Sequence, residues 1–325
     1  MNTTVTTPST QNYDVAIIGG GAAGLSAAQA LGRSLRKVLV IDAGKPRNAP
    51  AHAMHNFLSR DGMNPQELLA VGREELENYD VDVVSSTVVD TKRSKKGFEL
   101  TLANRAPATA RRVILAAGLR DILPEIDGVK EHWGNNVLHC PYCHGWEVRG
   151  KRLGINDSDF AVHQALMFTQ WSDSVTLFKS PQRVLNAEET EQLLARGVNI
   201  IEGTISSING TKDSLSTAVL TDGRQYPLEA LVIMPAMEAD ISAVCSLELK
   251  VSQHPVTAVP YVEVDGAGQS KVPGLWIAGS LADPKQQVIM AAAHGLAVGA
   301  AVNADLMAEE TRVAVERMRA SSEVR

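Results

Sequence analysis

The segment Val15–Gly24 reads VAIIGGGAAG, and this stretch decides the predicted fold. Its apolar start has the pattern of a buried strand, its glycines interrupt that strand, and an Ala- and Leu-rich helical pattern continues to about Leu35. A second apolar run, Lys37–Ile41, is followed directly by Asp42. Strand, glycine turn, helix, strand and acid in this order predict a dinucleotide-binding βαβ unit.

Each glycine of the segment has a separate predicted task. Gly19 permits the tight turn, Gly21 lets backbone N–H groups approach a pyrophosphate, and Gly24 allows the helix to pack closely on the strand. The helix N-terminus then faces the phosphates, while Asp42 accepts hydrogen bonds from a ribose. The predicted nucleotide contacts in this part are Gly19, Gly21, Ala22, Ala23, Gly24 and Asp42. A merely tight structural turn is the alternative interpretation.

Length and composition restrict the class of protein. A chain of 325 residues suggests two domains, and 44% hydrophobic with 21% charged residues is typical of a soluble globular protein. A formal net charge of -6 gives no reason to expect nucleic acid or an anionic membrane as partner. Residues 1–12 lack the pattern of a secretory signal and are expected to be a disordered lead-in. No apolar run approaches the roughly 20 residues that span a bilayer, so no membrane segment is expected.

Two of the three cysteines lie in Cys140-Pro141-Tyr142-Cys143-His144-Gly145. So few cysteines without an export signal indicate a reducing, cytoplasmic compartment, where a Cys-x-x-Cys is metal-binding or catalytic. No second Cys-x-x-Cys accompanies it, so we predict no metal. Two thiols at this spacing can open and close as a disulfide during turnover. Cys245 is isolated and is interpreted as a small buried apolar side chain.

The remainder of the chain completes the predicted architecture. Short strands from about Val81 to Leu115 resemble a β-meander, and a second α/β unit begins near Leu153. A late strand precedes Gly279, and an Ala-rich helix follows from about Gln287 to Leu306. These patterns predict an α/β fold with two Rossmann-like nucleotide-binding domains of the three-layer ββα type.

The order of these parts resembles the low-molecular-weight thioredoxin reductases and their relatives over nearly the whole chain. The resemblance implies FAD, held by a discontinuous domain of residues 13–122 and 247–325. It also implies a pyridine-nucleotide-type domain, residues 123–246, that carries the Cys-x-x-Cys. Further FAD contacts implied by matching positions are Asn56, Ala117, Gly118, Gly279, Ser280, Gln287 and Val288. Most relatives have an Asp where Ser280 stands, and because family members are commonly two-fold dimers, we expect a homodimer.

The second nucleotide motif departs from the family pattern. Asn156, Asp157 and Ser158 stand where the smaller domain of a thioredoxin reductase has its three glycines. The basic cluster that follows in the family, which reads the 2′-phosphate of NADPH, is reduced to Lys179-Ser180-Pro181. Side chains and an acid beside a pyrophosphate disfavour its binding, although NADPH could still bind in an unusual way.

A branch of the family with this defect is the dithiol oxidases similar to those of gliotoxin and holomycin biosynthesis, whose motif resembles Cys-Pro-x-Cys-His-Gly. The resemblance implies that electrons pass from a small-molecule dithiol to the enzyme disulfide, to FAD and to O2, with H2O2 as by-product. It also implies that Cys140 is attacked by substrate and that Cys143 faces the flavin. His144 replaces an Asp and is predicted to accept the thiol proton, with a structural histidine as the alternative.

Two other functions remain open from the sequence. An NADPH-dependent disulfide reductase would act on thioredoxin or a similar protein. A non-catalytic flavoprotein would use the disulfide of Cys140 and Cys143 as a redox sensor or a partner-binding switch.

Overall fold

The computed structural model describes residues 11–211 and 214–323, and the chain divides into two compact units. The first unit comprises Met1–Arg47, Gln66–Arg120 and Glu238–Arg325, and the second comprises Asn48–Pro65 and Asp121–Met237. The lead-in expected over residues 1–12 lies outside the described residues as far as residue 10, and a strand begins at Gln11. The predicted domain boundaries stay predictions, and each unit is described by itself.

A seven-stranded sheet forms the centre of the first unit, in the order β3-β2-β1-β6-β5-β4 with β19 against β6. Strands β3, β2, β1, β6 and β19 are parallel, whereas the pairs β4–β5 and β5–β6 are antiparallel, as the predicted meander requires. The strands are β1 Gln11–Ile18, β2 Val38–Asp42, β3 Val81–Ser85, β4 Val88–Ser94, β5 Gly97–Leu102, β6 Ala108–Leu115 and β19 Leu275–Ile277.

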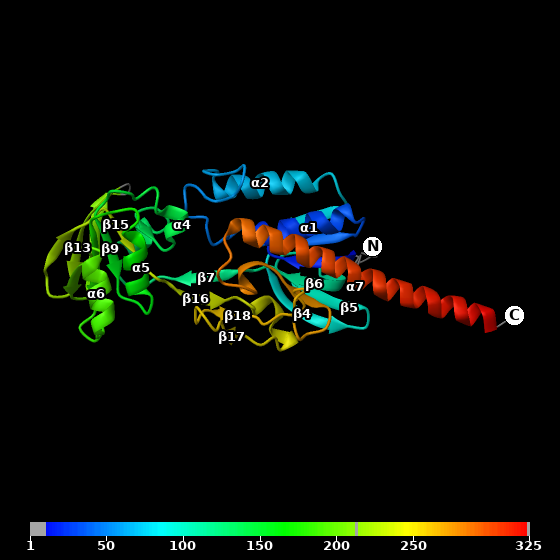
Figure 1. Cartoon of the computed structure of the whole chain (residues 1–325). Helices are drawn as coiled ribbons and strands as arrows, with labels where there is room; N and C mark the ends of the chain where they lie inside the picture. Colours follow the sequence, from blue (N-terminus) through cyan, green and yellow to red (C-terminus); the bar gives the residue numbers. More distant parts are fainter. Residues whose placement is uncertain (1–10, 212–213, 324–325) are drawn as a thin grey trace, which may run out of the picture. The chain divides into compact units, whose positions relative to one another are not determined.

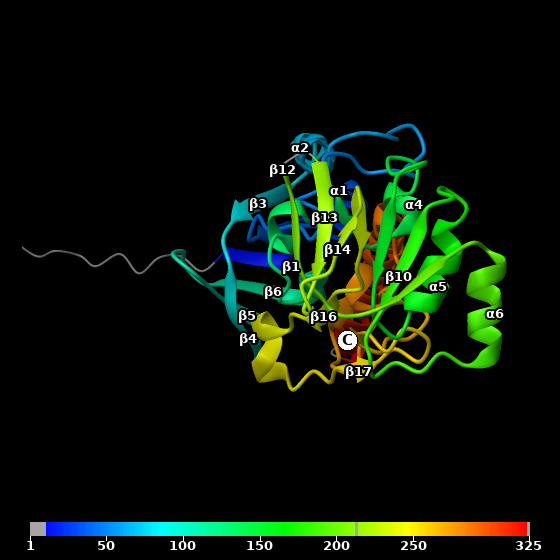
Figure 2. The ribbon, with the colours of Figure 1, turned by 90° about the vertical axis from the view of Figure 1, so that its left-hand side faces the viewer.

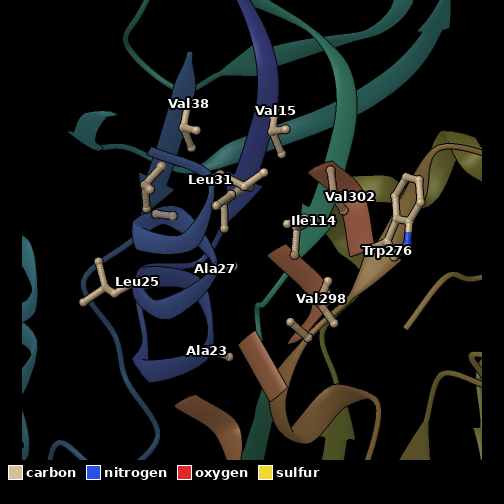
Figure 3. Close-up of a cluster of buried hydrophobic side chains, with 14 of the residues drawn as sticks. Val15, Ala23, Leu25, Ala27, Leu31, Val38, Ile114, Trp276, Val298 and Val302 are labelled. Carbon is tan, nitrogen blue, oxygen red and sulfur yellow. The ribbon is translucent and has the colours of Figure 1, made fainter. Parts of the chain in front are cut away.

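Helices α1 (Ala22–Arg33) and α7 (Val288–Glu323) lie side by side in the first unit (Figure 1). Small residues permit the approach, since a Cβ added at Gly295 of α7 would lie 2.0 Å from the carbonyl oxygen of Ala23. Figure 3 shows the core between them and the sheet, where residues of β1, β2, β6 and β19 meet those of both helices. The labelled residues of this core are Val15, Ala23, Leu25, Ala27, Leu31, Val38, Ile114, Trp276, Val298 and Val302.

The length and composition of helix α7 differ from what the sequence analysis predicted. This helix continues to Glu323, beyond the predicted end near Leu306, and residues Val288–Ser322 are long and apolar enough by composition to cross a membrane. The expectation that no segment approaches such a length was therefore wrong, because many Ala residues raise the mean hydropathy of the helix without forming a run of large apolar side chains. A single helix of this kind is weak evidence for a membrane span. Its residues Val298, Val302 and Leu306 are fully buried in the first unit.

The second unit has three layers around a five-stranded parallel sheet with the order β11-β10-β9-β15-β8. Helices α5 and α6 share one buried cluster with the sheet, and an antiparallel sheet of β12, β13 and β14 shares another (Figure 2). Their bounds are β8 Val137–Leu138, β9 Leu153–Asn156, β10 Val175–Lys179, β11 Asn199–Glu202, β12 Ile205–Thr211, β13 Ser214–Leu220, β14 Gln225–Pro227, β15 Ala230–Val232, α5 Ala161–Phe168 and α6 Ala187–Ala195. Both units thus have the predicted α/β fold built on parallel strands, which is confirmed.

Shorter elements complete the two units. They are α2 Pro65–Leu76, β7 Leu119–Ile122, α3 Val129–His132, α4 Pro141–His144, β16 Ala236–Ala239, the 3-10 helices η1 Ser242–Leu247 and η2 Gly279–Leu281, β17 Ser252–Gln253 and β18 Pro260–Tyr261. Strands β7 and β16 pair with each other, as do β17 and β18. Cys245, in η1, is exposed, and its Sγ lies 3.6 Å from an oxygen of Asp90, so the interpretation as a buried apolar side chain was wrong.

Candidate active site

The glycine turn between β1 and α1 has the geometry that a dinucleotide requires. Gly19 has φ +108°, and a Cβ there would lie 2.4 Å from the carbonyl oxygen of Ala116. A Cβ at Gly24 would lie 1.9 Å from the carbonyl oxygen of Gly19. At Gly21, by contrast, no described atom lies within 4 Å of the Cβ position, and no side chain caps the helix that begins at Ala22. Open space in front of uncapped N–H groups fits a phosphate.

Asp42 lies at the end of β2, where the sequence placed the ribose acid. Its Oδ1 accepts a hydrogen bond from the Gly44 N–H at 3.1 Å, and its Oδ2 lies 2.7 Å from an Nη of Arg73 in α2. Arg73 was not predicted, because no spacing in the sequence relates it to Asp42. The ion pair fixes the carboxylate at the edge of the glycine turn, and its ribose contact stays a prediction.

Two further predicted segments meet at the ends of β6 and β19 in the first unit. Gly118 (φ +72°) approaches Ser280, whose Oγ lies 3.5 Å from the Cβ position of Gly118. Gly279 (φ +80°) donates its N–H to Nδ1 of His294 at 3.2 Å, and Ala117 precedes Gly118 in the same turn. His294 was missed, and burial lowers its pKa while Asp283 opposes that shift. A neutral ring that accepts the Gly279 N–H holds this turn.

The start of α7 completes the predicted FAD contacts. The backbone carbonyl oxygen of Gln287 accepts a hydrogen bond from the Ala291 N–H at 2.9 Å, and the helix begins at Val288 with no acid in its first turn. The neighbouring Gln286 has a buried Oε1 that meets no hydrogen-bond partner among the described residues. A buried acceptor without a partner, an uncapped helix and the open space at Gly21 all fit FAD.

The paired cysteines lie in the second unit, at the beginning of α4. Cys140 is the N-cap residue of this short helix, and Pro141 occupies its first position, where no N–H is needed. The N–H of Cys143 donates to the carbonyl oxygen of Cys140 at 3.2 Å, and the two Sγ atoms are 2.8 Å apart. The turn therefore places the sulfurs for disulfide exchange.

His144 ends α4 beside the cysteines. Its Nδ1 is buried and has no hydrogen-bond partner in the described part of the chain. Burial lowers the pKa of its imidazole and His55 adds to the effect, whereas Glu147 acts in the opposite direction. A neutral imidazole with an unused ring nitrogen has the properties of a proton acceptor.

The loop around Asn56 is attached to the cysteine turn and belongs to the second unit. Asn56 has φ +62°, and its Nδ2 donates to the carbonyl oxygen of Tyr142, between the two cysteines, at 2.7 Å. Its backbone N–H donates to Asp61 at 2.9 Å. The structure thus gives Asn56 a contact with α4, and its flavin contact stays a prediction.

Side chains of the second unit pair with one another across the degenerate glycine turn. Asp157 accepts a hydrogen bond from the Ser180 N–H at 3.0 Å and forms an ion pair with Arg183, which also donates to the carbonyl oxygen of Ser158 at 2.6 Å. Lys179 is paired with Glu202 at 2.6 Å. Hydrogen bonds and the charge of Arg183 lower the pKa of Asp157 although burial opposes them. The remaining hollow, about 360 Å³, lies against Asp157 and Ser180.

The contact of Arg183 with this turn was not predicted from the sequence. Arg183 lies two residues beyond the basic positions that the family motif marks, so that motif could not reveal it. No group of three or more His, Cys, Asp or Glu that could hold a metal occurs within residues 11–211 and 214–323.

Comparisons with known proteins show which family the chain resembles. A sequence profile of the pyridine nucleotide-disulphide oxidoreductases matches residues 13–299. Thioredoxin reductase sirT of Leptosphaeria maculans is 31% identical over 311 residues, which are 90% of this chain and 93% of that protein. Thioredoxin reductase tcpT of Claviceps purpurea is 35% identical over 195 residues, 55% of this chain and 60% of that protein.

Two solved structures resemble the chain over nearly its whole length. The crystal structure of HlmI is 37% identical, with a TM-score of 0.89 over 95% of this chain and 97% of that one. The oxidoreductase from Agrobacterium tumefaciens is 36% identical, with a TM-score of 0.85 over 91% and 99%.

The two nucleotide-type folds and the paired cysteines define a flavin-dependent disulfide oxidoreductase. The chain belongs to the pyridine nucleotide-disulphide oxidoreductase family and is a thioredoxin reductase-like flavoprotein that binds FAD. The resemblance drawn from the sequence, the fold class and the cofactor are thereby confirmed.

Proposed function

We propose that the chain is a dithiol oxidase that forms a disulfide in a small-molecule dithiol. A substrate thiolate attacks Cys140, the bond from Cys140 to Cys143 breaks, and the second substrate thiol resolves the mixed disulfide. The substrate loses two electrons and two protons, and the enzyme disulfide gains them. Bound FAD would supply the two-electron acceptor for the enzyme dithiol, and O2 would receive those electrons as H2O2. His144 accepts the proton of an attacking thiol.

The observation that carries this proposal is the ion pair between Asp157 and Arg183. A phosphate of NADPH at this turn would meet the Asp157 carboxylate, and the Arg183 cation that could bind it is already occupied. This pair therefore disfavours NADPH as the source of electrons for the Cys-x-x-Cys and favours electron entry from thiols. The same argument disfavours an NADPH-dependent reductase of thioredoxin.

Anaerobic stopped-flow absorbance of the flavin tests the direction of electron flow. Dithiothreitol should bleach the flavin, and readmitted O2 should restore it with H2O2 formed in equal amount. Micromolar NADPH should leave the flavin oxidised. Cys140→Ser should prevent reduction by the dithiol while FAD stays bound. Bleaching by micromolar NADPH, or no bleaching by any dithiol, would refute the proposed reaction.

The resemblance extends the proposal in three respects. We infer a two-fold homodimer, cytoplasmic location, and FAD contacts at the residues that the sequence analysis named. Light scattering of the purified protein gives the mass that tests the first of these inferences.

A further inference from the structure

His294 of α7 joins two segments that the sequence analysis assigned to FAD. Its Nδ1 lies 3.2 Å from the backbone nitrogen of Gly279 and 3.1 Å from Nε2 of Gln286. Gly279 belongs to one predicted FAD turn, and Gln286 directly precedes Gln287 at the other. All of these residues lie in the first unit. One ring nitrogen therefore connects both segments, and the proposed reaction gives it no role.

The protonation state of this ring follows from its partners. A backbone N–H can only donate, so Nδ1 of His294 accepts from Gly279 and carries no proton. The neutral ring then has its proton on Nε2. Because Nδ1 is an acceptor, the group of Gln286 that faces it is the amide NH2. The histidine thereby fixes the direction in which the Gln286 amide points.

The opposite atom of the Gln286 amide is a buried acceptor. Its Oε1 meets no hydrogen-bond donor in the described part of the chain. A buried acceptor that stays unpaired destabilises a folded chain. A hydroxyl or N–H group of FAD can supply the missing donor, and this contact requires that the amide keep the direction set by His294.

Close packing fixes the position of the His294 ring. The next residue along α7, Gly295, approaches α1 so closely that a Cβ there would lie 2.0 Å from the carbonyl oxygen of Ala23. A Cβ at Gly279 would lie 3.0 Å from the Cβ of the same Ala23. Both sides of the hydrogen bond between His294 and Gly279 are therefore packed against the first turn of α1.

We propose that His294 is a positioning residue for FAD, whose unprotonated Nδ1 holds the Gly279 turn and aims Oε1 of Gln286 at a donor group of the cofactor. A proton on Nδ1 sets a third N–H against the other two, so the Gly279 contact breaks and the Gln286 amide reverses to offer Oε1 to the ring. FAD affinity falls in acid, because the cofactor binds the form with one proton fewer. The inference rests on FAD binding and not on the proposed oxidase reaction.

Few charged groups face His294 within the part of the chain that the structure describes. Burial lowers the pKa of its imidazole, and Asp283 opposes that shift. Oδ1 of Asp283 also lies 4.0 Å from Nε2 of His254. Of the elements packed on α7, helix α1 carries only Arg33, in its last turn, while β19 and η2 carry no charge. The adjoining loops add two exposed residues, Asp265 and Lys285. Because burial lowers its pKa, His294 is neutral at pH 7 and gains a proton only in acid.

Titration of the full chain with FAD, followed by flavin fluorescence from pH 7.5 to 4.5, tests the inference, with circular dichroism to check the fold at each pH. The dissociation constant of the unsubstituted protein should rise at least about threefold as the pH falls, since one titrating group changes affinity by up to about tenfold per pH unit. His294→Asn should bind with nearly constant affinity, because its Oδ1 can take the place of Nδ1 and does not titrate. Gln286→Met should weaken binding at pH 7.5 by about three- to tenfold, the loss of one hydrogen bond.

His163→Asn, the same substitution at an exposed histidine of α5, is the matched control and should keep the pH dependence of the unsubstituted protein. An equal fall of affinity in His294→Asn and in the unsubstituted protein would overturn the proposal, and so would unchanged FAD binding in Gln286→Met.

A second measurement needs no substituted protein to fold. 15N NMR of labelled histidine should show His294, identified by its proximity to the Gly279 amide proton, as the neutral ring with its proton on Nε2. A proton on Nδ1 at pH 7.5 would also overturn the proposal. None of these measurements requires turnover, so a failure of the proposed oxidase reaction is distinguishable from a failure of this inference.

Discussion

In the turn between β1 and α1, an added methyl group should lower stability at Gly24 but lower FAD affinity at Gly21. At Gly24 a Cβ would lie 1.9 Å from the carbonyl oxygen of Gly19 and 3.0 Å from its carbon. Both neighbours are backbone atoms, so α1 must move away from β1 by about 1 Å or more to restore normal contact. Such overpacking costs about 1–3 kcal/mol or more. Gly24→Ala should therefore lower the melting temperature by roughly 4–10 °C.

Gly21 is the matched position. Its φ of -78° and ψ of -175° suit alanine, and no described atom lies within 4 Å of the added methyl. The free energy of unfolding should fall by less than about 1 kcal/mol, the cost of a poorer N-cap residue. The methyl would, however, occupy the space in which the pyrophosphate is predicted to lie, so FAD affinity should fall at least about tenfold, which corresponds to roughly 1.4 kcal/mol.

The assay combines thermal unfolding of deflavinated protein, followed by circular dichroism, with titration of FAD fluorescence. Gly24→Ala should lose stability without FAD, and Gly21→Ala should lose affinity while its apoprotein melts close to the unsubstituted chain. The reasoning is refuted if Gly24→Ala melts unchanged, or if Gly21→Ala binds FAD as the unsubstituted protein does.

Three other predictions follow from the second unit and from η1. Arg183→Ala should destabilise the unit by about 1–3 kcal/mol at pH 7, because a charged hydrogen-bond partner of Asp157 is lost. The low pKa of folded Asp157 stabilises the fold above the ordinary carboxyl range, so the difference seen in urea unfolding should shrink as the pH falls below about 4. Asn56→Ala should release the Tyr142 carbonyl and speed amide exchange in α4, whereas Asn56→Gln keeps the polar group; equal exchange in both would contradict this. Cys245 should react with iodoacetamide in the folded protein, and mass spectrometry that finds it unmodified would show that it is buried.

Local patterns predicted the parts of the fold that depend on neighbours in sequence. The glycine turn, the Cys-x-x-Cys and the alternation of strands and helices are each contained within a few residues, and spacing alone identifies them. The ends of helices were less certain: α1 ends at Arg33, and α7 continues to Glu323. Arg111 forms ion pairs with Glu309 and Glu310 of α7, and Arg112 forms one with Glu309. These charged residues beyond the predicted helix end therefore have partners on β6.

Contacts between distant segments could not be predicted. Arg73 pairs with Asp42 across 31 residues, and Asn56 reaches Tyr142 across 86. Sequence reasoning placed the loop around Asn56 only in the FAD domain, because it follows β2 along the chain. The structure shows that this loop packs with the cysteine turn, which depends on side-chain hydrogen bonds that no periodicity encodes.

The ion pair of Asp157 and Arg183 also bears on how much NADPH the cell would lose to oxygen. A flavin that gives electrons to O2 and also accepts them from NADPH would consume the cell's reducing power in an unproductive cycle. Asp157 forms an ion pair with Arg183 at the turn where the family's second glycine motif would lie, and in the proposed function its carboxylate opposes a cofactor phosphate there. In the proposed reaction the Asp157 carboxylate disfavours NADPH binding, so that oxygen is consumed only when a dithiol is present.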